Sequence, residues 1–548
     1  MLLLGLATRG PLVGAYLANW DAVQYALGMA EFDVTRHQPH PPGSLLYVAL
    51  GRALLGLTGD PQRALGLISV LGGSVSLVLC AVVGRMLFGW RIAVAGTLLY
   101  ATSPLTWYYG GVALPYALEG ALVLGLVALL WPAAEERRPA SALAAAAVLA
   151  VAGGVRPTTM LLLLPLWLFA TWRACALPAP LALRAGRVRL SGTWPSARRG
   201  WLWLLAGLAL LGALCLAWAV PLLVLSGGPG VYATASRRLS SLVSELTSVF
   251  VVGLPAVAWN VQYLIDVSIL GLNLALVPLL VFLLPGRRWP WRPSASQAVF
   301  LALWAGPALV VFVALHVGQA GYLLLLWPLV CYAAGTAALV AGEEIGRRWP
   351  ALGRRASSLL LGALAASGIA IFLFSPLLAG GSAGLTLGAV REHDREWRSL
   401  TALAEEWPEQ EGQVALLTGT HARESFRLAT YYLPHLHVYA IGLDRDGDLG
   451  IAFQGYEGEH SYAGFMAGEP AAQEVALPAG TRRLLILDEG VARLFPEGSL
   501  QEVPLTPWRS VWLWPATPPT QHAGSTPPTP PSAPDLTRLE VRSPLHPG

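Results

Sequence analysis

The chain has 548 residues, of which 55% are hydrophobic and only 12% charged, with a formal net charge of +4. Soluble domains carry about 25% charged residues, so this composition excludes a single soluble enzyme. The mean hydropathy is +0.55, and apolar runs of about 20 residues recur, which indicates a polytopic helical membrane protein. The small positive charge gives no reason to expect a nucleic acid partner.

The cysteines indicate neither a disulfide framework nor a cysteine metal site. They are scattered and form no CxxC pair: Cys80, Cys175, Cys215 and Cys331. The part of the chain that is predicted to be soluble contains none. The Lys and Arg positions are all Arg, alongside many Ala, Leu, Gly and Pro residues. Because this is a compositional bias, the presence of one Arg at a position is weak evidence for a functional role there.

The first residues, Met1–Ala7, are apolar but too short to cross a membrane, and Thr8–Pro11 interrupts them. They lack the basic start and the small-residue cleavage site of a signal peptide. We expect them to be the end of a first transmembrane helix that begins before Met1.

The segment Asn19–Arg52 is the most polar long stretch in the first part of the chain. It holds three acids, two histidines and a rigid proline-rich run: Asp21, Glu31, Asp33, His37, His40 and Pro39–Gly43. Asp21 follows the first apolar segment, and an Asp with a pKa near ~3.9 is a carboxylate at neutral pH. Such a group can accept a proton from a hydroxyl; a helix cap or a solvated surface charge is the plainer interpretation.

The hydropathy pattern predicts about eleven membrane helices, the incomplete first one included. Several are short, which is typical of tilted or broken helices around a polar cavity. Besides the first, the predicted helices are 64–88, 92–106, 116–132, 140–154, 158–173, 201–225, 264–285, 297–316, 320–341 and 356–378.

Arginine predicts the orientation. If the helices alternate, four Arg-rich loops fall on one side, which the positive-inside rule assigns to the cytoplasm. These loops contain Arg137 and Arg138; Arg173, Arg184, Arg187, Arg189, Arg198 and Arg199; Arg287, Arg288 and Arg292; and Arg347, Arg348, Arg354 and Arg355. The outer side then receives Asn19–Arg63, Thr106–Pro115, Val155–Thr158, Ser226–Tyr263, His316–Tyr322 and the chain after about Gly380.

The last third of the chain is predicted to be soluble. A helix near Glu396–Trp407 and another at Ala422–Tyr432 alternate with strands, which favours a small α/β domain over residues 385–515. The predicted strands are Gln413–Thr418, His437–Ile441, Arg483–Leu487 and Ser510–Trp514. Residues 516–548 are rich in Pro, Thr and Ser and are expected to be disordered.

The pattern WDxxQYALG, then FDV, then HQPHPPGxxLYVALGR resembles the first outer loop of the GT-C membrane glycosyltransferases. The most similar branch is the bacterial protein-O-mannosyltransferase-like family, in whose H-P-P-G-Y-P-L-Y loop Tyr-Pro stands where this chain has Ser44 and Leu45. Weaker similarities are Val112–Glu119, Gly153–Thr158 and His316–Tyr322. The resemblance covers about the first 340 residues and predicts the transmembrane catalytic domain at residues 1–380, with its first outer loop at 19–63.

The resemblance implies a membrane glycosyltransferase, a hexosyltransferase of mannosyltransferase-like type acting in the cell envelope. Such enzymes move a sugar from a polyprenyl-phosphate donor to a protein, lipid or glycan acceptor outside the cytoplasm, in one inverting displacement. Asp21 would be the general base. Arg156 would stabilise the phosphate leaving group, together with the N-terminus of the helix that Pro157 can start.

The remaining predicted substrate-binding residues are Asp33, His37, His40, Glu119, His316, Gln319 and Tyr322. Plainer interpretations stay open: Arg156 as an interfacial residue, His316 as a helix cap, and Glu119 as a charge at a helix N-terminus. The acids next after Asp21 are Glu31 and Asp33, so one or two carboxylates could work in the site. No metal or other cofactor is expected, although some lipid-linked sugar transferases use a divalent metal.

Two other functions compete with the transferase. A transporter or flippase of a lipid-linked or polar solute would show charged residues in mid-membrane and related halves, whereas here the polar residues gather in outer loops. A non-enzymatic assembly protein built around the soluble domain would leave the loop motif unexplained.

Overall fold

The computed structural model describes residues 1–175, 194–284, 292–375, 384–405, 414–419, 423–443, 449–467, 469, 472, 474–475, 477, 481–507, 509–514 and 539–540. Predictions for Arg184, Arg187, Arg189, Arg287 and Arg288, and for the tail apart from 539–540, lie outside these residues. Two compact units form. Unit 1 combines Met1–Gly14 with Pro41–Val390, and unit 2 combines Ala15–His40 with Arg391–Gly548. The first part of the predicted outer loop therefore shares a unit with the C-terminal part; the predicted domain boundaries stay predictions.

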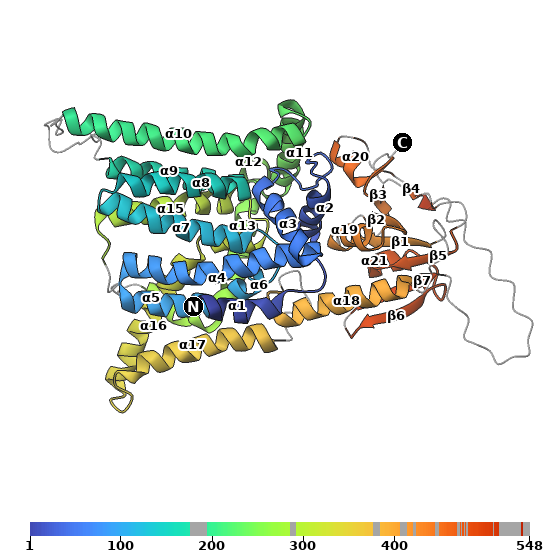
Figure 1. The fold of residues 1–548 in the computed structure, drawn as a ribbon. Helices are drawn as coiled ribbons and strands as arrows, with labels where there is room; N and C mark the ends of the chain where they lie inside the picture. Colours follow the sequence, from blue (N-terminus) through green and yellow to red (C-terminus); the bar gives the residue numbers. More distant parts are fainter. Residues whose placement is uncertain are drawn as a thin grey trace, which may run out of the picture. The chain divides into compact units, whose positions relative to one another are not determined.

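Unit 1 is helical throughout its described part, and its long helices run roughly alongside one another (Figure 1). In its first half, α4 packs against α7 and α5, and α8 packs against α9 and α10. The helices of this half are α1 (Leu2–Arg9), η1 (Gly10–Leu12), α3 (Leu45–Thr58), α4 (Pro61–Phe88), α5 (Trp90–Thr102), α6 (Pro104–Tyr109), α7 (Tyr116–Glu135), α8 (Pro139–Val155), α9 (Pro157–Ala174) and α10 (Trp194–Leu225).

The second half of unit 1 continues with shorter helices between long ones, and α16 packs against α5 and α17. Its helices are α11 (Pro229–Thr247), α12 (Val249–Val252), α13 (Leu254–Leu272), η2 (Asn273–Ala275), α14 (Leu276–Leu283), α15 (Ala295–Ala314), η3 (Ala320–Leu325), α16 (Trp327–Arg348) and α17 (Arg355–Phe374).

Seven helices of the described part are long and apolar enough to cross a membrane, and three shorter apolar helices accompany them. The seven are Pro61–Phe88, Tyr116–Glu135, Arg199–Leu225, Leu254–Leu283, Ala295–Ala314, Trp327–Arg348 and Arg355–Phe374. The predicted multi-pass helical architecture is confirmed, while the total of about eleven spans stays a prediction.

Two predicted spans began at the wrong residue. The span predicted at 264–285 begins at Leu254, after Gly253 with φ 81° and with Pro255 in its first turn. Residues 254–263 were assigned to the outer segment Ser226–Tyr263, but they are helical, and the Asn260 side chain is buried and donates to two backbone carbonyls. The span predicted at 320–341 begins as η3, and its α-helix starts only at Trp327, next to Pro328.

Unit 2 contains α2 (Trp20–Ala30), most of α18 (Leu387–Glu405) and a mixed sheet. The Asn19 side chain caps α2 by accepting a hydrogen bond from the amide of Ala22, at 3.0 Å. The sheet has six strands in the order β3-β2-β1-β5-β7-β6, with β1 parallel to β2 and β5 and the outer pairs antiparallel. These strands are β1 (Val414–Gly419), β2 (His437–Leu443), β3 (Leu449–Gln454), β5 (Arg483–Ile486), β6 (Gln501–Thr506) and β7 (Arg509–Trp514).

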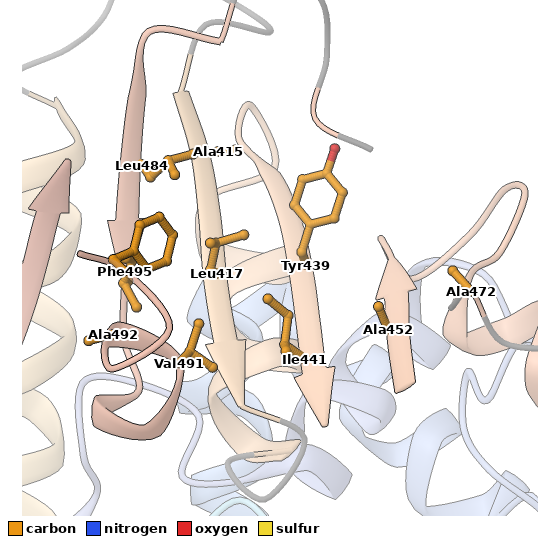
Figure 2. Close-up of a cluster of buried hydrophobic side chains, with 11 residues drawn as sticks. Ala415, Leu417, Tyr439, Ile441, Ala452, Ala472, Leu484, Val491, Ala492 and Phe495 are labelled. Carbon is orange, nitrogen blue, oxygen red and sulfur yellow. The ribbon is translucent and has the colours of Figure 1, made fainter. Parts of the chain in front are cut away.

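The central strand β1 is buried at all six positions, as expected for a parallel strand covered on both faces. On one face, Leu417 of β1 and Ile441 of β2 pack with Val491, Ala492 and Phe495 (Figure 2). On the other, α19 (Arg423–Tyr432) packs against β1 and β2. The α/β character is therefore confirmed; the sheet is accompanied by α20 (Tyr462–Ala467), α21 (Glu489–Ala492) and the short pair β4 (Glu474–Val475) and β8 (Leu539–Glu540).

Candidate active site

Unit 1 gathers one group of the predicted residues around Arg156. Arg156 lies in an extended conformation between α8 and α9 (φ −153°, ψ 103°), and Pro157 opens α9. Its Nη1 lies 3.1 Å from Oε2 of Glu119, in the first turn of α7. Both side chains are largely buried, with exposed fractions of 14% and 5%. Thr159 donates from its hydroxyl to the other Glu119 oxygen, so the two charges form a hydrogen-bonded pair.

Aromatic rings surround the Arg156 guanidinium. Its central carbon lies 3.8 Å from the ring centroid of Tyr322 and 5.1 Å from that of Tyr116. This is the range of cation–π attraction. Tyr116 also contacts Tyr109, with centroids 5.3 Å apart. A Cβ at Gly321 would lie 2.3 Å from the Tyr116 ring, so only glycine permits this approach.

His316 belongs to the same group. Its ring centroid lies 6.0 Å from that of Tyr322, and its Nδ1 lies 3.2 Å from the hydroxyl of Thr247 at the end of α11. Asn260 fixes that helix end, because its amide donates to the carbonyl of Thr247 at 3.0 Å. The backbone carbonyl of Gln319 accepts the amide of Tyr322 at 3.1 Å. The structure thus brings together Glu119, Arg156, His316 and Tyr322, with Gln319 in the adjoining turn.

A second group lies in unit 2, around Asp21 in the first turn of α2. An acid there is favoured by the helix dipole. Its Oδ1 lies 3.6 Å from Nδ1 of His40, and Oε1 of Gln24 contacts the same nitrogen and accepts the backbone amide of His40 at 3.2 Å. Because Asp21 Oδ1 and Gln24 Oε1 both face Nδ1 as acceptors, they favour the His40 tautomer that carries its proton on Nδ1. The pair is a quarter exposed, so the Asp21 carboxylate is held in a fixed position and still accessible.

Asp33 and His37 organise the loop that follows α2. The backbone of Asp33 exchanges two hydrogen bonds with Gln38, and its Oδ1 accepts the amide and hydroxyl of Thr35 at 2.8 and 2.7 Å. His37 is buried with φ 54° and packs edge-on to Tyr462. Burial, helped by the charges of His40 and Arg427, lowers the pKa of His37 to about 3, so its imidazole is neutral near pH 7. The contacts of both residues are those of loop formation.

Other parts of unit 2 hold the segment that leads into α2. The Asp394 carboxylate on α18 accepts the amides of Ala15 and Tyr16 at 2.9 and 3.1 Å. His393 donates from Nε2 to the carbonyl of Leu17 at 2.9 Å, and the Tyr432 hydroxyl accepts the amide of Leu17 at 2.8 Å. Every backbone polar group engaged here precedes Asp21 by a few residues, so α18 and α19 fix the start of the Asp21 loop.

Several residues of these groups were missed by sequence reasoning: Thr159, Tyr116, Thr247, Gln24 and Asp394. Gln24 lies inside the motif WDxxQYALG and Tyr116 inside the similar segment Val112–Glu119, so both segments contained a signal for them. Nothing local marks the other three, because their partners are distant in sequence. Among the described residues, no three His, Cys, Asp or Glu side chains gather as metal ligands would, and the expectation that no metal is needed stays a prediction.

Comparisons with known proteins identify the fold. No protein-family model and no curated protein sequence matches the chain. The crystal structure of ArnT from Cupriavidus metallidurans bound to undecaprenyl phosphate is similar, with a TM-score of 0.51 and 14% identity over 94% of this chain and 97% of ArnT. Apo ArnT gives the same score and identity over 94% and 96%. The Archaeoglobus fulgidus oligosaccharyltransferase in complex with zinc and sulfate scores 0.45, at 13% identity over 89% of this chain and 67% of that one. The ArnT match confirms the predicted fold, a GT-C helical membrane domain with a small C-terminal sheet domain.

Proposed function

We propose that this protein is a membrane glycosyltransferase that uses a polyprenyl-phosphate-linked sugar as donor. The observation that carries the proposal is the fold shared with ArnT along nearly the whole chain, since one of the two ArnT crystal structures contains bound undecaprenyl phosphate. The accessible carboxylate of Asp21 and the buried cation of Arg156 supply the two kinds of group that such a transfer needs.

Asp21 is the proposed general base. Its carboxylate takes the proton of the acceptor hydroxyl while the hydroxyl oxygen forms a bond to the anomeric carbon of the donor sugar. The bond between that carbon and the phosphate oxygen breaks in the same step, and polyprenyl phosphate leaves as an anion. A single displacement inverts the anomeric configuration. His40 orients the carboxylate through the contact between Nδ1 and Oδ1.

Arg156 is the proposed partner of the leaving phosphate. A fixed guanidinium stabilises charge that develops on a phosphate oxygen, and the amides at the start of α9 add to this field. Glu119 and Tyr322 hold the guanidinium in place. His316, Gln319 and Tyr322 are proposed to contact the donor, and Asp33 and His37 to shape the loop on the acceptor side. A mannosyl-type hexose, a protein, lipid or glycan acceptor, and an extracytoplasmic C-terminal domain complete the proposal.

The test is transfer by the purified full-length protein in lipid nanodiscs, with radiolabelled polyprenyl-phosphate hexoses and a cell-envelope extract as acceptor. We expect Asp21→Asn to lower the turnover number by about 10²–10⁴-fold, the usual contribution of general base catalysis. The matched control is Asp60→Asn, which removes a carboxylate that caps α4 and replaces it with an equally good cap. Wild-type turnover by Asp21→Asn, with Asp60→Asn also active, refutes the assignment of the base.

A transporter of lipid-linked solutes is the second function, because a buried pair such as Glu119–Arg156 also occurs along transport pathways. The two functions predict different products. A transporter moves the labelled lipid across a vesicle membrane with its sugar still attached, whereas the proposed transferase separates sugar from lipid. Flipping of intact donor without any release of polyprenyl phosphate contradicts the glycosyltransferase.

A further inference from the structure

Unit 2 contains a buried arginine that the proposed reaction does not use. Arg427, on α19, has an exposed fraction of 3%. Its Nε and Nη2 are buried and have no hydrogen-bond partner among the described residues. Native proteins leave few buried polar groups unpaired, and an unpaired buried charge is strongly destabilising. The position of Arg427 therefore requires an explanation beyond packing.

No described acid forms an ion pair with Arg427, although the charge of Glu457 lies close enough to favour the charged guanidinium. The nearby carboxylate, Glu457, is already bound by Arg36, whose Nε and Nη2 donate to it at 3.0 and 2.7 Å. Gln38 donates to the same carboxylate at 3.3 Å. Burial lowers the pKa of Arg427 to about 10, so the guanidinium keeps its charge at neutral pH. Arg36 also donates from Nη1 to Glu31 at 2.9 Å, so both acids of this group are engaged by Arg36 and neither forms an ion pair with Arg427.

The two free donors of Arg427 lie on one edge of the guanidinium. The N–H groups at Nε and Nη2 point the same way and match the two oxygens of a carboxylate or phosphate. Arg36 uses this same edge to bind the carboxylate of Glu457. The flat face of Arg427 is covered by Tyr456, whose ring centroid lies 3.1 Å from the guanidinium carbon. Stacking thus fixes the plane of the group and leaves its bidentate edge free.

The cluster extends to the start of α2. Tyr456 stacks on Tyr462, with centroids 5.7 Å apart, and Tyr462 meets the ring of Trp20 edge-on at 4.9 Å. Trp20 directly precedes Asp21 in the chain. Arg36 and Glu457, which lie beside Arg427, have side chains that are 34% and 45% exposed, so the cluster borders on solvent.

We propose that Arg427 is an oxyanion-binding residue that receives a carboxylate or phosphate group carried by the acceptor. The assignment of the anion to the acceptor rests on the proposed glycosyltransferase function; the binding of an oxyanion by Arg427 does not. The partner is thus an acidic glycan, an acidic peptide segment or a phosphorylated lipid headgroup, all of which present the same pair of oxygens.

Binding is tested with the full-length protein in detergent by isothermal titration calorimetry at constant ionic strength. The probes are glucuronate for a carboxylate, glucose 1-phosphate for a phosphate and methyl glucoside as the neutral control. We expect one anionic probe to bind and the neutral sugar not to bind. Arg427→Gln should weaken that binding at least tenfold. Arg493→Gln, which removes an exposed arginine of the same unit paired with Glu489, should bind as the wild type does.

The melting temperature gives a second readout, because replacing a purely structural arginine would lower it. Arg427→Gln removes a buried charge whose Nε and Nη2 have no hydrogen-bond partner among the described residues, so the variant should melt at or above the wild-type temperature. A variant that melts several degrees lower, or fails to fold, shows that Arg427 is structural and overturns the proposal. Arg427→Lys keeps the charge but loses the bidentate edge, and affinity equal to that of the wild type would also overturn it.

Transfer kinetics test the link to the acceptor separately. Arg427→Gln should raise the acceptor KM about tenfold and leave kcat within threefold, because Arg427 does not touch the reacting atoms. An unchanged KM, with anion binding lost, refutes the assignment to the acceptor. If the Asp21→Asn experiment instead refutes the transferase, the calorimetric experiment still tests oxyanion binding by Arg427, because that binding does not depend on the transfer reaction.

Discussion

The buried pair of Glu119 and Arg156 allows a quantitative prediction. In Glu119→Gln the amide keeps the shape of the side chain and an acceptor for the Thr159 hydroxyl, but the negative charge is lost. The Arg156 side chain, 14% exposed, is then left without its carboxylate. Breaking a buried ion pair on one side costs about 3–5 kcal/mol, because the remaining charge is uncompensated.

The structure narrows that range. Two unit charges about 4 Å apart attract by about 4 kcal/mol at an effective dielectric constant of 20. The rings of Tyr322 and Tyr116 face the guanidinium in the wild type and the variant alike, so their cation–π attraction cancels in the comparison. We therefore expect Glu119→Gln to lower the free energy of unfolding by about 4 kcal/mol.

The assay is reversible unfolding in mixed micelles, with Glu119→Gln, Arg156→Gln and the double variant forming a cycle. The double variant should be less destabilised than the sum of the single variants, with a coupling energy of about 2–3 kcal/mol. Exposed ion pairs give about 0.2–1 kcal/mol in such cycles. A coupling energy below about 0.5 kcal/mol would refute the argument that this pair is buried and mutually dependent.

Two further predictions concern packing and pH. Gly321→Ala should destabilise the protein by about 1–3 kcal/mol, because its Cβ would overlap the Tyr116 ring; Gly362→Ala, where the Cβ meets nothing within 4 Å, should not. Chemical unfolding distinguishes the two, and equal effects would contradict the packing argument. His37 has a folded-state pKa of about 3, against 6.5 for a free imidazole, so the unfolded chain binds its proton first. Stability is therefore lost as the pH falls from about 6.5 toward 3, by about 2 kcal/mol at pH 5. Asn tolerates the positive φ of this position, so His37→Asn should lose less melting temperature than the wild type between pH 7 and pH 5. An equal loss in the two proteins would contradict the assignment of this pH dependence to His37.

Hydropathy and turn residues predicted most of the architecture. Long apolar runs such as that of α4 exceed the length a membrane requires, and the strands of the C-terminal domain are apolar stretches between charged or glycine-rich turns. Two elements, α3 and β6, were not predicted. The helix α3 has only 14 residues, fewer than a membrane span needs. The strand β6 contains Pro504, which argues against a strand except at the edge of a sheet, where β6 lies.

The site was only partly predictable. The residue types and their loops followed from motifs, but pairing between distant positions did not. Glu119 was predicted to bind substrate, with a charge at a helix N-terminus as the plainer alternative, and only the structure pairs it with Arg156. Arg427 gave no signal at all, because an arginine on an amphipathic helix is normally solvated. Sequence periodicity predicts which face of a helix is apolar, but it does not predict which charged side chains become buried or which residues they pair with.

The hydrogen bonds that join the backbone of residues 15–17 to the side chains of Asp394, His393 and Tyr432 have a consequence for protein engineering. A chimera that exchanges only the chain after Val390 would combine a foreign α18 with the native entry to α2, and these backbone groups would lose their partners. Crossover points at 14/15 and 40/41, in addition to 390/391, keep the interacting segments together. The Asp21 loop can therefore be exchanged intact only together with a second, distant segment of the coding sequence.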